Sequence, residues 1–257
     1  MSGSTMQPDI IQSTIPIWSQ ALGSWNVSIT RNAFEARELK KEYDEVAGVW
    51  QSKIERLGFV KGYQRLMEAA FFNRALLPTR PLKVLDAGIG TGAMSTAFTQ
   101  VVETPVEILG VDLSPRMLEE ARENVTGPGV CIETLESDLI DLPVPSNSFD
   151  VVLMAHVVEH SINPISILVE MHRVLKPGGV LIASITCPSL FGRYIQLVWR
   201  THRVTPDTAC DWLEAAEFTV PEVVGFDTSA TAGARSLGYI AHKAATPLRD
   251  GGDDDEL

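Results

Sequence analysis

Short apolar runs alternate with amphipathic helical stretches from residue 81 onward, and this alternation constrains the fold more than any other feature of the chain. The strand-like runs, each bounded by Gly, Pro, Asp or Ser, are residues 82–87, 106–113, 130–135, 149–157 and 179–185. Helical periodicity fills the intervening residues 93–102, 114–125 and 164–175. Repetition of strand and helix predicts a parallel sheet covered by helices on both faces.

The last third of the chain predicts a different end to this sheet. Residues 219–226 and 237–241 are two further strand-like runs, joined by residues 227–236. That link is shorter than the crossover of about a dozen residues that parallel neighbours need. We therefore expect a Rossmann-like α/β fold with a seven-stranded sheet, mostly parallel, that ends in an antiparallel hairpin.

Segments around the sheet complete the domain plan. Residues 1–31 show no sustained period and are predicted to be a flexible arm, and residues 32–80 hold two amphipathic helices that predict a helical cap. The core spans residues 81–245 and contains an aromatic-rich insertion, predicted to be a lid, near residues 188–203. Residues 246–257 carry five acids and one base, which predicts a disordered acidic tail.

Charge and cysteine content restrict the partners and the compartment. The chain has 21 Lys and Arg against 33 Asp and Glu, a net charge of −12 that repels phosphate backbones and anionic membrane surfaces. Nucleic acid and membranes are therefore not expected as partners. The odd, unpaired cysteines Cys131, Cys187 and Cys210, together with the absence of a signal-peptide pattern, favour a cytoplasmic location.

Gly88, Gly90 and Gly92 alternate directly between the first core strand and the helix that follows it. Glycine permits positive φ and lets a ligand lie against bare backbone at a helix N-terminus. Asp112 ends the next strand, where it is placed to accept hydrogen bonds from ribose hydroxyls. With Ala93 the spacing also satisfies the dinucleotide fingerprint, so an NAD-dependent oxidoreductase is a second interpretation. A tight turn beside a surface aspartate is the alternative without a ligand.

Three motifs further along the chain separate these interpretations. They are residues 136–139 (ESDL), 149–152 (FDVV) and 173–179 (RVLKPGG). In this order, with the glycine turn and Asp112, the set resembles the class I S-adenosylmethionine-dependent methyltransferases. Within them it is most similar to the small-molecule branch that includes the ubiquinone and menaquinone C-methyltransferases. The resemblance, which covers residues 82–187, implies S-adenosyl-L-methionine as cofactor and in-line methyl transfer to an N, O or C atom of a small molecule.

The resemblance also implies which residues contact the cofactor, all of them at the carboxyl ends of strands. They are Asp86, Gly88, Gly90, Gly92, Asp112, Asp138, Leu139 and Ala155. The glycines would line the methionine and ribose, Asp86 would orient the ammonium group, and Asp112 would hold the ribose hydroxyls. Asp138 and the Leu139 backbone N–H would face adenine. A loop aspartate that caps its own backbone is the alternative for Asp138.

His156, at the end of the fourth core strand, is the candidate catalytic base beside the transferable methyl group. The alternative is a hydrogen-bonded wall residue, since the sequence assigns it no partner carboxylate. Residues 156–160 also spell the inverted zinc-protease motif H-x-x-E-H, which needs both histidines on one helix face. Because His156 is predicted to end a strand, no metal is expected. Glu159 and His160 are predicted to shape the turn into the next helix.

Aromatic residues on both sides of the core are candidates for the substrate pocket. They are Tyr43, Trp50, Tyr63, Phe191, Tyr194 and Trp199. Each has helix packing as its alternative role, but together they would form an apolar pocket that favours a small, partly aromatic or amine acceptor. A protein that binds the cofactor for regulation or for chemistry other than methyl transfer is a further interpretation. The oligomeric state stays open, with a homodimer as one candidate.

Overall fold

The computed structural model describes residues 14–32, 36–56, 58–71, 80–187, 201–226 and 236–245. Three predicted pocket residues, Phe191, Tyr194 and Trp199, lie outside the described residues, as do most of the predicted lid insertion and the predicted acidic tail. Within the described ranges, no helix combines the length and apolar character that crossing a bilayer requires.

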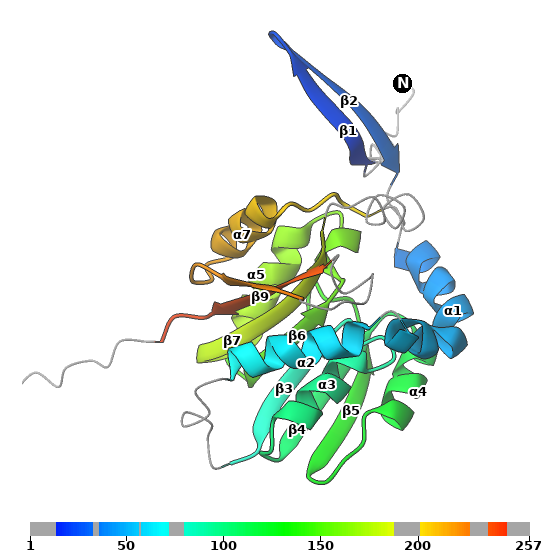
Figure 1. Cartoon of the computed structure of the whole chain (residues 1–257), viewed down its shortest axis with the longest axis vertical. Coiled ribbons are helices and arrows are strands. Elements are labelled where there is room, and N and C mark those ends of the chain that lie inside the picture. Colours follow the sequence, from blue (N-terminus) through cyan, green and yellow to red (C-terminus); the bar gives the residue numbers. More distant parts are fainter. Residues whose placement is uncertain are drawn as a thin grey trace, which may run out of the picture.

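A seven-stranded sheet forms the centre of the molecule, with strand order β5-β4-β3-β6-β7-β9-β8 (Figure 1). Its strands are β3 (Leu82–Ala87), β4 (Val106–Asp112), β5 (Val130–Glu136), β6 (Phe149–Ala155), β7 (Leu175–Thr186), β8 (Glu222–Gly225) and β9 (Ser236–His242). Neighbours from β5 to β7 pair in parallel, whereas β9 pairs antiparallel with both β7 and β8. The predicted mostly parallel sheet with an antiparallel C-terminal hairpin is confirmed.

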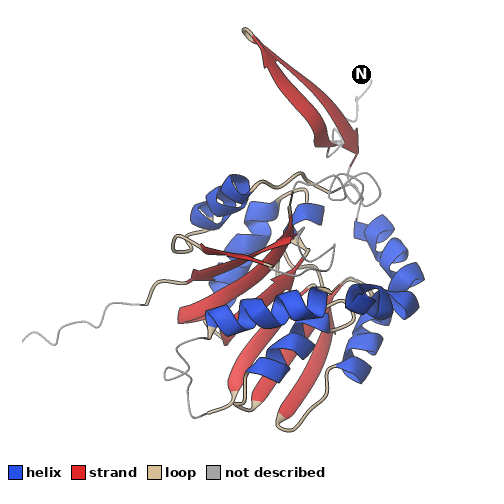
Figure 2. Cartoon of the chain, viewed as in Figure 1, coloured by secondary structure: helices blue, strands red, loops and turns tan. Residues whose placement is uncertain are grey.

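Helices cover both faces of this sheet (Figure 2). In the described ranges they are α1 (Ala36–Arg56), α2 (Phe59–Ala70), α3 (Ala93–Val101), α4 (Pro115–Asn124), α5 (Pro164–Val174), α7 (Pro206–Ala215) and the short 3-10 helix η2 (Val158–His160). The starts of α4, α5 and α7 share one sequence device, a side-chain N-cap followed by proline. Ser114, Asn163 and Thr205 each accept a hydrogen bond from a backbone N–H three residues on.

The hydrophobic core lies on both sides of the sheet. On one side, Leu66 of α2 and Phe98 of α3 are buried against Val84 of β3. On the other side, Met171 of α5 and Leu213 of α7 are buried against the opposite face. Because successive strand side chains point to opposite faces, a sheet buried on both sides needs continuous apolar strands, which this sequence provides.

The two helices of the predicted cap occupy different places. The side chain of Leu66 on α2 packs so closely on the sheet that a Cβ added at Gly238 of β9 would lie 2.4 Å from Leu66 Cδ1. A Cβ added at Gly62 of α2 would lie 2.6 Å from the Phe226 ring. The α2 helix therefore belongs to the core layer beside α3, whereas α1 packs next to α4 at the carboxyl ends of the strands.

Residues 14–32 form an antiparallel hairpin of β1 (Thr14–Leu22) and β2 (Trp25–Asn32), which differs from the flexible arm predicted for residues 1–31. The overlooked signals are the alternation of Trp25, Val27 and Ile29 with polar residues and the two-residue turn at Gly23, whose φ is +61°. This alternation is short, and the proline within β1 argues against a strand in a sequence reading.

Candidate active site

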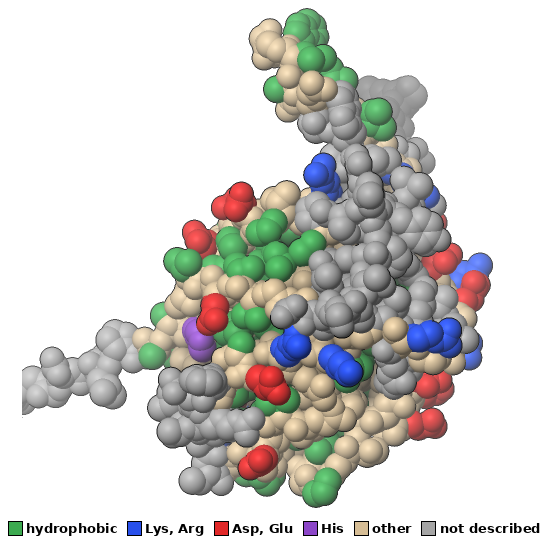
Figure 3. Space-filling model, in the orientation of Figure 1, with side chains coloured by type: hydrophobic (Ala, Val, Ile, Leu, Met, Phe, Trp, Pro, Cys, Tyr) green, Lys and Arg blue, Asp and Glu red, His purple; other side chains and the backbone are tan. Residues whose placement is uncertain are grey.

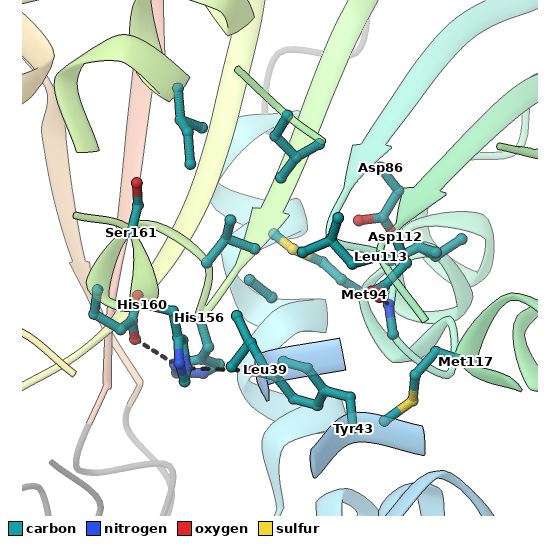
Figure 4. Close-up of a pocket in the computed structure, with 18 of the residues that line it drawn as sticks. Leu39, Tyr43, Asp86, Met94, Asp112, Leu113, Met117, His156, His160 and Ser161 are labelled. Atoms are coloured by element: carbon teal, nitrogen blue, oxygen red, sulfur yellow. Dashed lines mark hydrogen bonds and ion pairs between the residues drawn. The ribbon is translucent and has the colours of Figure 1, made fainter. Parts of the chain in front are cut away.

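A cavity of about 600 Å³ opens at the carboxyl ends of β3, β4, β5 and β6 and is bounded by α1 and α2 (Figure 4). The chain leaves β3 towards β4 and β5 and returns on its other side as β6, so the cavity lies where the strand order reverses. Most predicted site residues line it, namely Tyr43, Trp50, Tyr63, Asp86, Gly88, Gly90, Asp112, Asp138, Leu139, Ala155 and His156.

The glycine turn brings bare backbone to the cavity wall. Gly88 and Gly90 have φ of +73° and +53°, in the left-handed region that favours glycine. A Cβ added at Gly88 would lie 2.4 Å from Val157 Cγ2, whereas one at Gly90 would have no atom within 4 Å. Gly90 therefore faces open space in the cavity, where a ligand can approach the main chain.

Gly92 does not line the cavity, so the structure lends its predicted cofactor contact no support. It is the N-cap of α3 with φ of +85°, and a Cβ there would lie 2.4 Å from Val125 Cγ2. Gly92 is thus needed for the close approach of this turn to the end of α4. A glycine that packs and a glycine that faces a ligand look alike in a sequence.

Asp112 ends β4 and is fixed by the main chain of two loops. Its Oδ2 accepts a hydrogen bond of 3.0 Å from the Gly90 N–H, and its Oδ1 accepts one of 2.9 Å from the Ser114 N–H. Burial raises the pKa of Asp112, although these backbone hydrogen bonds oppose the shift. Each carboxylate oxygen has a second lone pair, so Asp112 can also accept two hydroxyl hydrogens from a ligand.

Asp86 is a buried acid at the base of the same turn. Its Oδ2 accepts a 2.6 Å hydrogen bond from Ser95 Oγ, while its buried Oδ1 has no hydrogen-bond partner among the described residues. Burial raises the pKa of Asp86 to about 7, against the opposing effect of the Ser95 hydrogen bond. An unsatisfied carboxylate oxygen in the wall of a cavity favours a ligand with a positive charge or a donor group.

Asp138 and Leu139 line the cavity beyond the end of β5. The Asp138 Oδ1 accepts a hydrogen bond of 3.1 Å from the Ile140 N–H, so the residue caps its own loop. The self-capping alternative is therefore present, and it occurs at a residue that also lines the cavity. The capping bond holds the carboxylate in place at the cavity wall.

His156 follows β6 with φ of +56°, a conformation that is rare outside glycine. Its backbone N–H donates to the Ser184 carbonyl at 2.8 Å, and its ring meets the Phe59 ring edge-on at 5.2 Å between centroids. Its Nδ1 lies 3.2 Å from Glu159 Oε1 and 3.0 Å from Thr186 Oγ1. A strained backbone held by such contacts is typical of functional sites. Here it places the imidazole on the cavity wall.

Glu159 is the partner carboxylate of His156, which the sequence prediction did not assign. It is only 2% exposed, and its Oε1 also accepts hydrogen bonds from the N–H and Oγ1 of Thr186 at 3.2 and 3.1 Å. Burial favours a higher pKa, but the hydrogen bond and charge of His156 outweigh it and lower the pKa of Glu159. Glu159 is therefore an ionised wall residue as well as part of the turn.

The histidines of the H-x-x-E-H motif do not share a helix face. His156 precedes the 3-10 helix η2, and His160 ends it. The His160 Nε2 lies 3.4 Å from the Tyr43 hydroxyl, and burial lowers the pKa of His160 to about 4. In the described part of the chain, no group of three His, Cys, Asp or Glu side chains could hold a metal ion.

Helix α1 closes the cavity from above the strand ends. Lys40 forms an ion pair with Glu136 at the end of β5, and Asp44 accepts a hydrogen bond from Ser114 Oγ after β4. The Tyr43 ring meets the Trp50 ring edge-on at 6.3 Å between centroids. These contacts place the predicted aromatic residues of α1 on the cavity side, as expected for a pocket.

Among the wall residues that the sequence analysis did not select are the neighbours of His156, namely Phe59, Glu159 and Thr186. Glu159 had a usable signal, because it follows His156 by three residues. Phe59 begins α2 directly after Gly58, a position that by itself indicates a helix start. Thr186 ends β7, and only the pairing of β6 with β7 shows that it lies beside His156.

Residues 85–183 match the sequence family described as "Methyltransferase domain". This core is a methyltransferase domain. Enzymes of this kind use S-adenosylmethionine as the methyl donor. The match covers the stretch from β3 to β7 that carries the glycine turn, Asp112, Asp138 and His156, so the family resemblance is confirmed.

A curated relative of the methyltransferase domain is the ubiquinone/menaquinone biosynthesis C-methyltransferase of Burkholderia vietnamiensis, which is 33% identical over 159 residues. That match covers 60% of this chain and 65% of the relative. The chain thus spans just under two thirds of the length of the curated relatives it matches.

Solved structures share the fold of the methyltransferase domain. A Haloferax volcanii complex of a methyltransferase with the Trm112 activator matches with a TM-score of 0.61 and 19% identity, covering 79% of this chain and 98% of that one. The [4+2]-cyclase SpnF matches with a TM-score of 0.60 and 18% identity, covering 83% and 98%. At these identities the likeness concerns the fold alone.

The cavity residues fit S-adenosylmethionine better than a dinucleotide. The buried Asp86 oxygen suits the cofactor's ammonium group, whereas it would repel a pyrophosphate at the same turn. Among the described residues that line the cavity there is no Lys or Arg to balance a pyrophosphate. Gly90 leaves the space that a Cβ would fill, and Asp112 retains acceptor capacity for the ribose.

Proposed function

We propose that this protein transfers a methyl group from S-adenosylmethionine to a small-molecule acceptor, at an N, O or C atom. The observation that carries the proposal is the convergence of Asp86, Gly90, Asp112 and Asp138 from three strand ends on one cavity. The orphaned Asp86 carboxylate matches an ammonium group, and the bare backbone at Gly90 leaves room for the methionine and ribose. The free acceptor capacity of Asp112 matches the ribose hydroxyls, and that of Asp138 matches adenine.

The residues divide into binding and reacting groups. Asp86 would bind the ammonium group, and Asp112 would accept hydrogen bonds from the ribose hydroxyls. Gly88 and Gly90 would line the methionine and ribose. Asp138 and the Leu139 N–H would contact adenine, with Ala155 beside the transferred methyl group. S-adenosylmethionine supplies a methyl group on a sulfonium, a good leaving group, so alignment and exclusion of water provide much of the catalysis, about 7–11 kcal/mol in favourable cases.

His156 would accept the proton that the acceptor loses. Its Nδ1 faces the ionised Glu159, which favours the tautomer with the proton on Nδ1 and leaves Nε2 as the base. The weak 3.4 Å contact of Nε2 with Ser184 Oγ does not block that role. An ionised oxygen can attack without a base, whereas a carbon acid gains from a proton acceptor. His156 therefore stays a candidate base until the acceptor is known.

Isothermal titration of the purified chain tests cofactor binding. We expect heat with S-adenosylmethionine and none with NADH, and Asp112→Ala is expected to weaken binding at least about tenfold. Glu107→Ala is the matched control on β4, because its 3.9 Å pair with Lys83 is exposed and contributes little. Binding of NADH without S-adenosylmethionine heat would contradict the proposal and favour the oxidoreductase.

Transfer itself is tested by mass spectrometry of a metabolite extract incubated with the protein and deuteromethyl-labelled cofactor. A product that gains the label names the acceptor, and His156→Ala is expected to slow its formation with little change in cofactor affinity. If cofactor binds but no label moves, chemistry other than methyl transfer becomes the better proposal. The SpnF match shows that this fold also occurs in an enzyme named as a cyclase. The cytoplasmic location and the homodimer stay predictions.

A further inference from the structure

Glu159 is the one acid of the cavity wall that the proposed cofactor contacts do not use. It is almost fully buried, and its Oε1 is saturated by His156 and Thr186. Its second oxygen, Oε2, is buried and has no hydrogen-bond partner among the described residues. An ionised oxygen left in this state costs several kcal/mol unless a ligand satisfies it, so the cavity is incomplete without a donor at this point.

Glu159 belongs to a different part of the cavity from the cofactor acids. Figure 4 shows Asp86 and Asp112 on one side of the cavity, with His156 and His160 on the opposite side and Tyr43 between them. Glu159 bonds to His156, so it lies with the second group. A cofactor held by Asp86 and Asp112 therefore leaves Glu159 to the acceptor.

The charged side chains that line the cavity determine whether a cationic or an anionic acceptor is expected to bind. Four carboxylates line the cavity, those of Asp86, Asp112, Asp138 and Glu159. No Lys or Arg side chain of the described residues lines it, and His160 stays neutral near pH 7 because burial lowers its pKa to about 4. Such a wall attracts a cation and repels a carboxylate or phosphate, and its low dielectric strengthens both effects.

Aromatic rings complete the surroundings of His156 and Glu159. Phe59 and Tyr63 both lie against the His156 ring, at 5.2 and 6.4 Å between centroids, and both line the cavity. Burial and the negative charge of Glu159 raise the pKa of Tyr63, so its phenol stays neutral. Neutral aromatic faces beside a buried carboxylate are the surroundings that bind organic ammonium groups.

We propose that the methyl acceptor is an organic amine, whose N–H groups bind Glu159 Oε2 between the rings of Phe59 and Tyr63. This inference rests on the proposed function and narrows its acceptor class. The bound ammonium gives one proton to His156 Nε2, and the freed nitrogen lone pair forms the new bond to the methyl carbon. The carbon–sulfur bond breaks with its electron pair on sulfur. The product is a methylated ammonium, and the imidazolium next to Glu159 later returns its proton to water.

Three probes of nearly equal shape test the charge preference directly. They are 2-phenylethylamine, 2-phenylethanol and phenylacetate, which at pH 7 are a cation, a neutral molecule and an anion. Their dissociation constants are measured by calorimetry on the full chain saturated with S-adenosylhomocysteine. We expect the amine to bind at least about tenfold more tightly than the alcohol, and phenylacetate to bind most weakly.

Glu159→Gln keeps the size of the side chain and removes its charge, so it is expected to bring the amine within about threefold of the alcohol. Glu107→Gln is the control of the same chemistry, because Glu107 lies on β4 outside the cavity lining and its 3.9 Å pair with Lys83 is exposed. This control is expected to keep the full amine preference. If Glu159→Gln does not fold, the ranking of the three probes on the unaltered chain decides alone.

An alcohol or phenylacetate that binds as tightly as the amine would overturn the inference, and so would failure of all three probes to bind. A preference that survives in Glu159→Gln would overturn the role of Glu159. Binding of S-adenosylhomocysteine in the same cell separates the two levels of the proposal. If the homocysteine product binds and the ranking fails, only the amine acceptor is lost.

Discussion

The raised pKa of Asp86 makes cofactor affinity depend on pH. The carboxyl has a pKa of about 7 in the free protein, and only its ionised form attracts an ammonium group. Affinity for S-adenosylmethionine is therefore expected to fall below pH 7, by up to about tenfold per pH unit for one linked proton. Calorimetry between pH 5.5 and 7 measures this slope. Asp86→Asn should bind more weakly at pH 7 and show a flatter profile.

The raised pKa of Asp86 also makes the free energy of unfolding depend on pH. This free energy falls as the pH rises, whereas the affinity for the cofactor increases. Because the folded carboxyl holds its proton up to about pH 7 and the unfolded one only to its ordinary 3.8, this contribution is full below pH 3.8 and is lost as pH rises to 7. Urea unfolding of the free protein is therefore expected to show a smaller loss between pH 5.5 and 7 in Asp86→Asn. Equal pH slopes in both proteins would contradict the assignment of the pKa to Asp86.

At the scale of elements, the packing of α2 on the sheet depends on a glycine that leaves room for a side chain. Gly238 of β9 meets Leu66, whereas Gly225 on the paired strand β8 has no atom within 4 Å of an added Cβ. Gly238→Ala is expected to lower the free energy of unfolding by about 1–3 kcal/mol through overpacking. Gly225→Ala is the control and should stay within about 0.5 kcal/mol. Denaturant titrations of both variants compare them, and equal losses would contradict the close approach of α2.

Helix α5 supports the loop after β5, part of which lines the cavity. Arg173 of α5 donates to the Leu142 and Val144 carbonyls and pairs with Glu170. The motif RVLKPGG, noted as a family signature, thus fixes the loop that begins with Asp138. An arginine on one face of the sheet in this way supports a loop whose first residues line the cavity at the strand ends.

For the whole molecule, the β1–β2 hairpin stands apart from the methyltransferase domain. Its apolar side chains Leu22, Trp25, Val27 and Ile29 are exposed, Trp25 to 76%, and Figure 3 shows apolar side chains on the projecting hairpin. In the described residues it makes no extensive contact with another element. Deletion of residues 1–32 is therefore expected to change the free energy of unfolding by less than about 0.5 kcal/mol and to leave cofactor affinity unchanged.

Urea unfolding and calorimetry of the shortened chain check that expectation. A loss of more than about 1 kcal/mol would show that the hairpin packs against the domain in solution. A loss of cofactor affinity at unchanged stability would instead mean that the hairpin supports α1. Trp25 fluorescence offers an internal check, because an indole exposed to this extent should emit as in water.

Sequence patterns were sufficient for the sheet and for the strand-end residues that line one side of the cavity. Strand runs, glycine turn and the acids at strand ends are local features, and parallel strands bring their carboxyl ends to one rim whatever the details of packing. Asp86, Gly88, Gly90, Asp112 and Asp138 were therefore predictable one at a time. The short hairpin at residues 14–32 was missed because its alternation is brief.

Only the tertiary structure decided which glycine opens on the cavity and which acid keeps an unsatisfied oxygen in its wall. Gly90 and Gly92 flank the same Thr91 and both have a positive φ, yet one opens on the cavity and the other packs on Val125. The surroundings of Glu159 depend on the pairing of β6 with β7, which brings Thr186 close to Glu159. Thr186 donates a hydrogen bond to Glu159 Oε1, whereas Oε2 has no partner among the described residues. Local patterns determine where strands and turns form, but the contacts of a side chain depend on neighbours that register and packing bring from elsewhere in the chain.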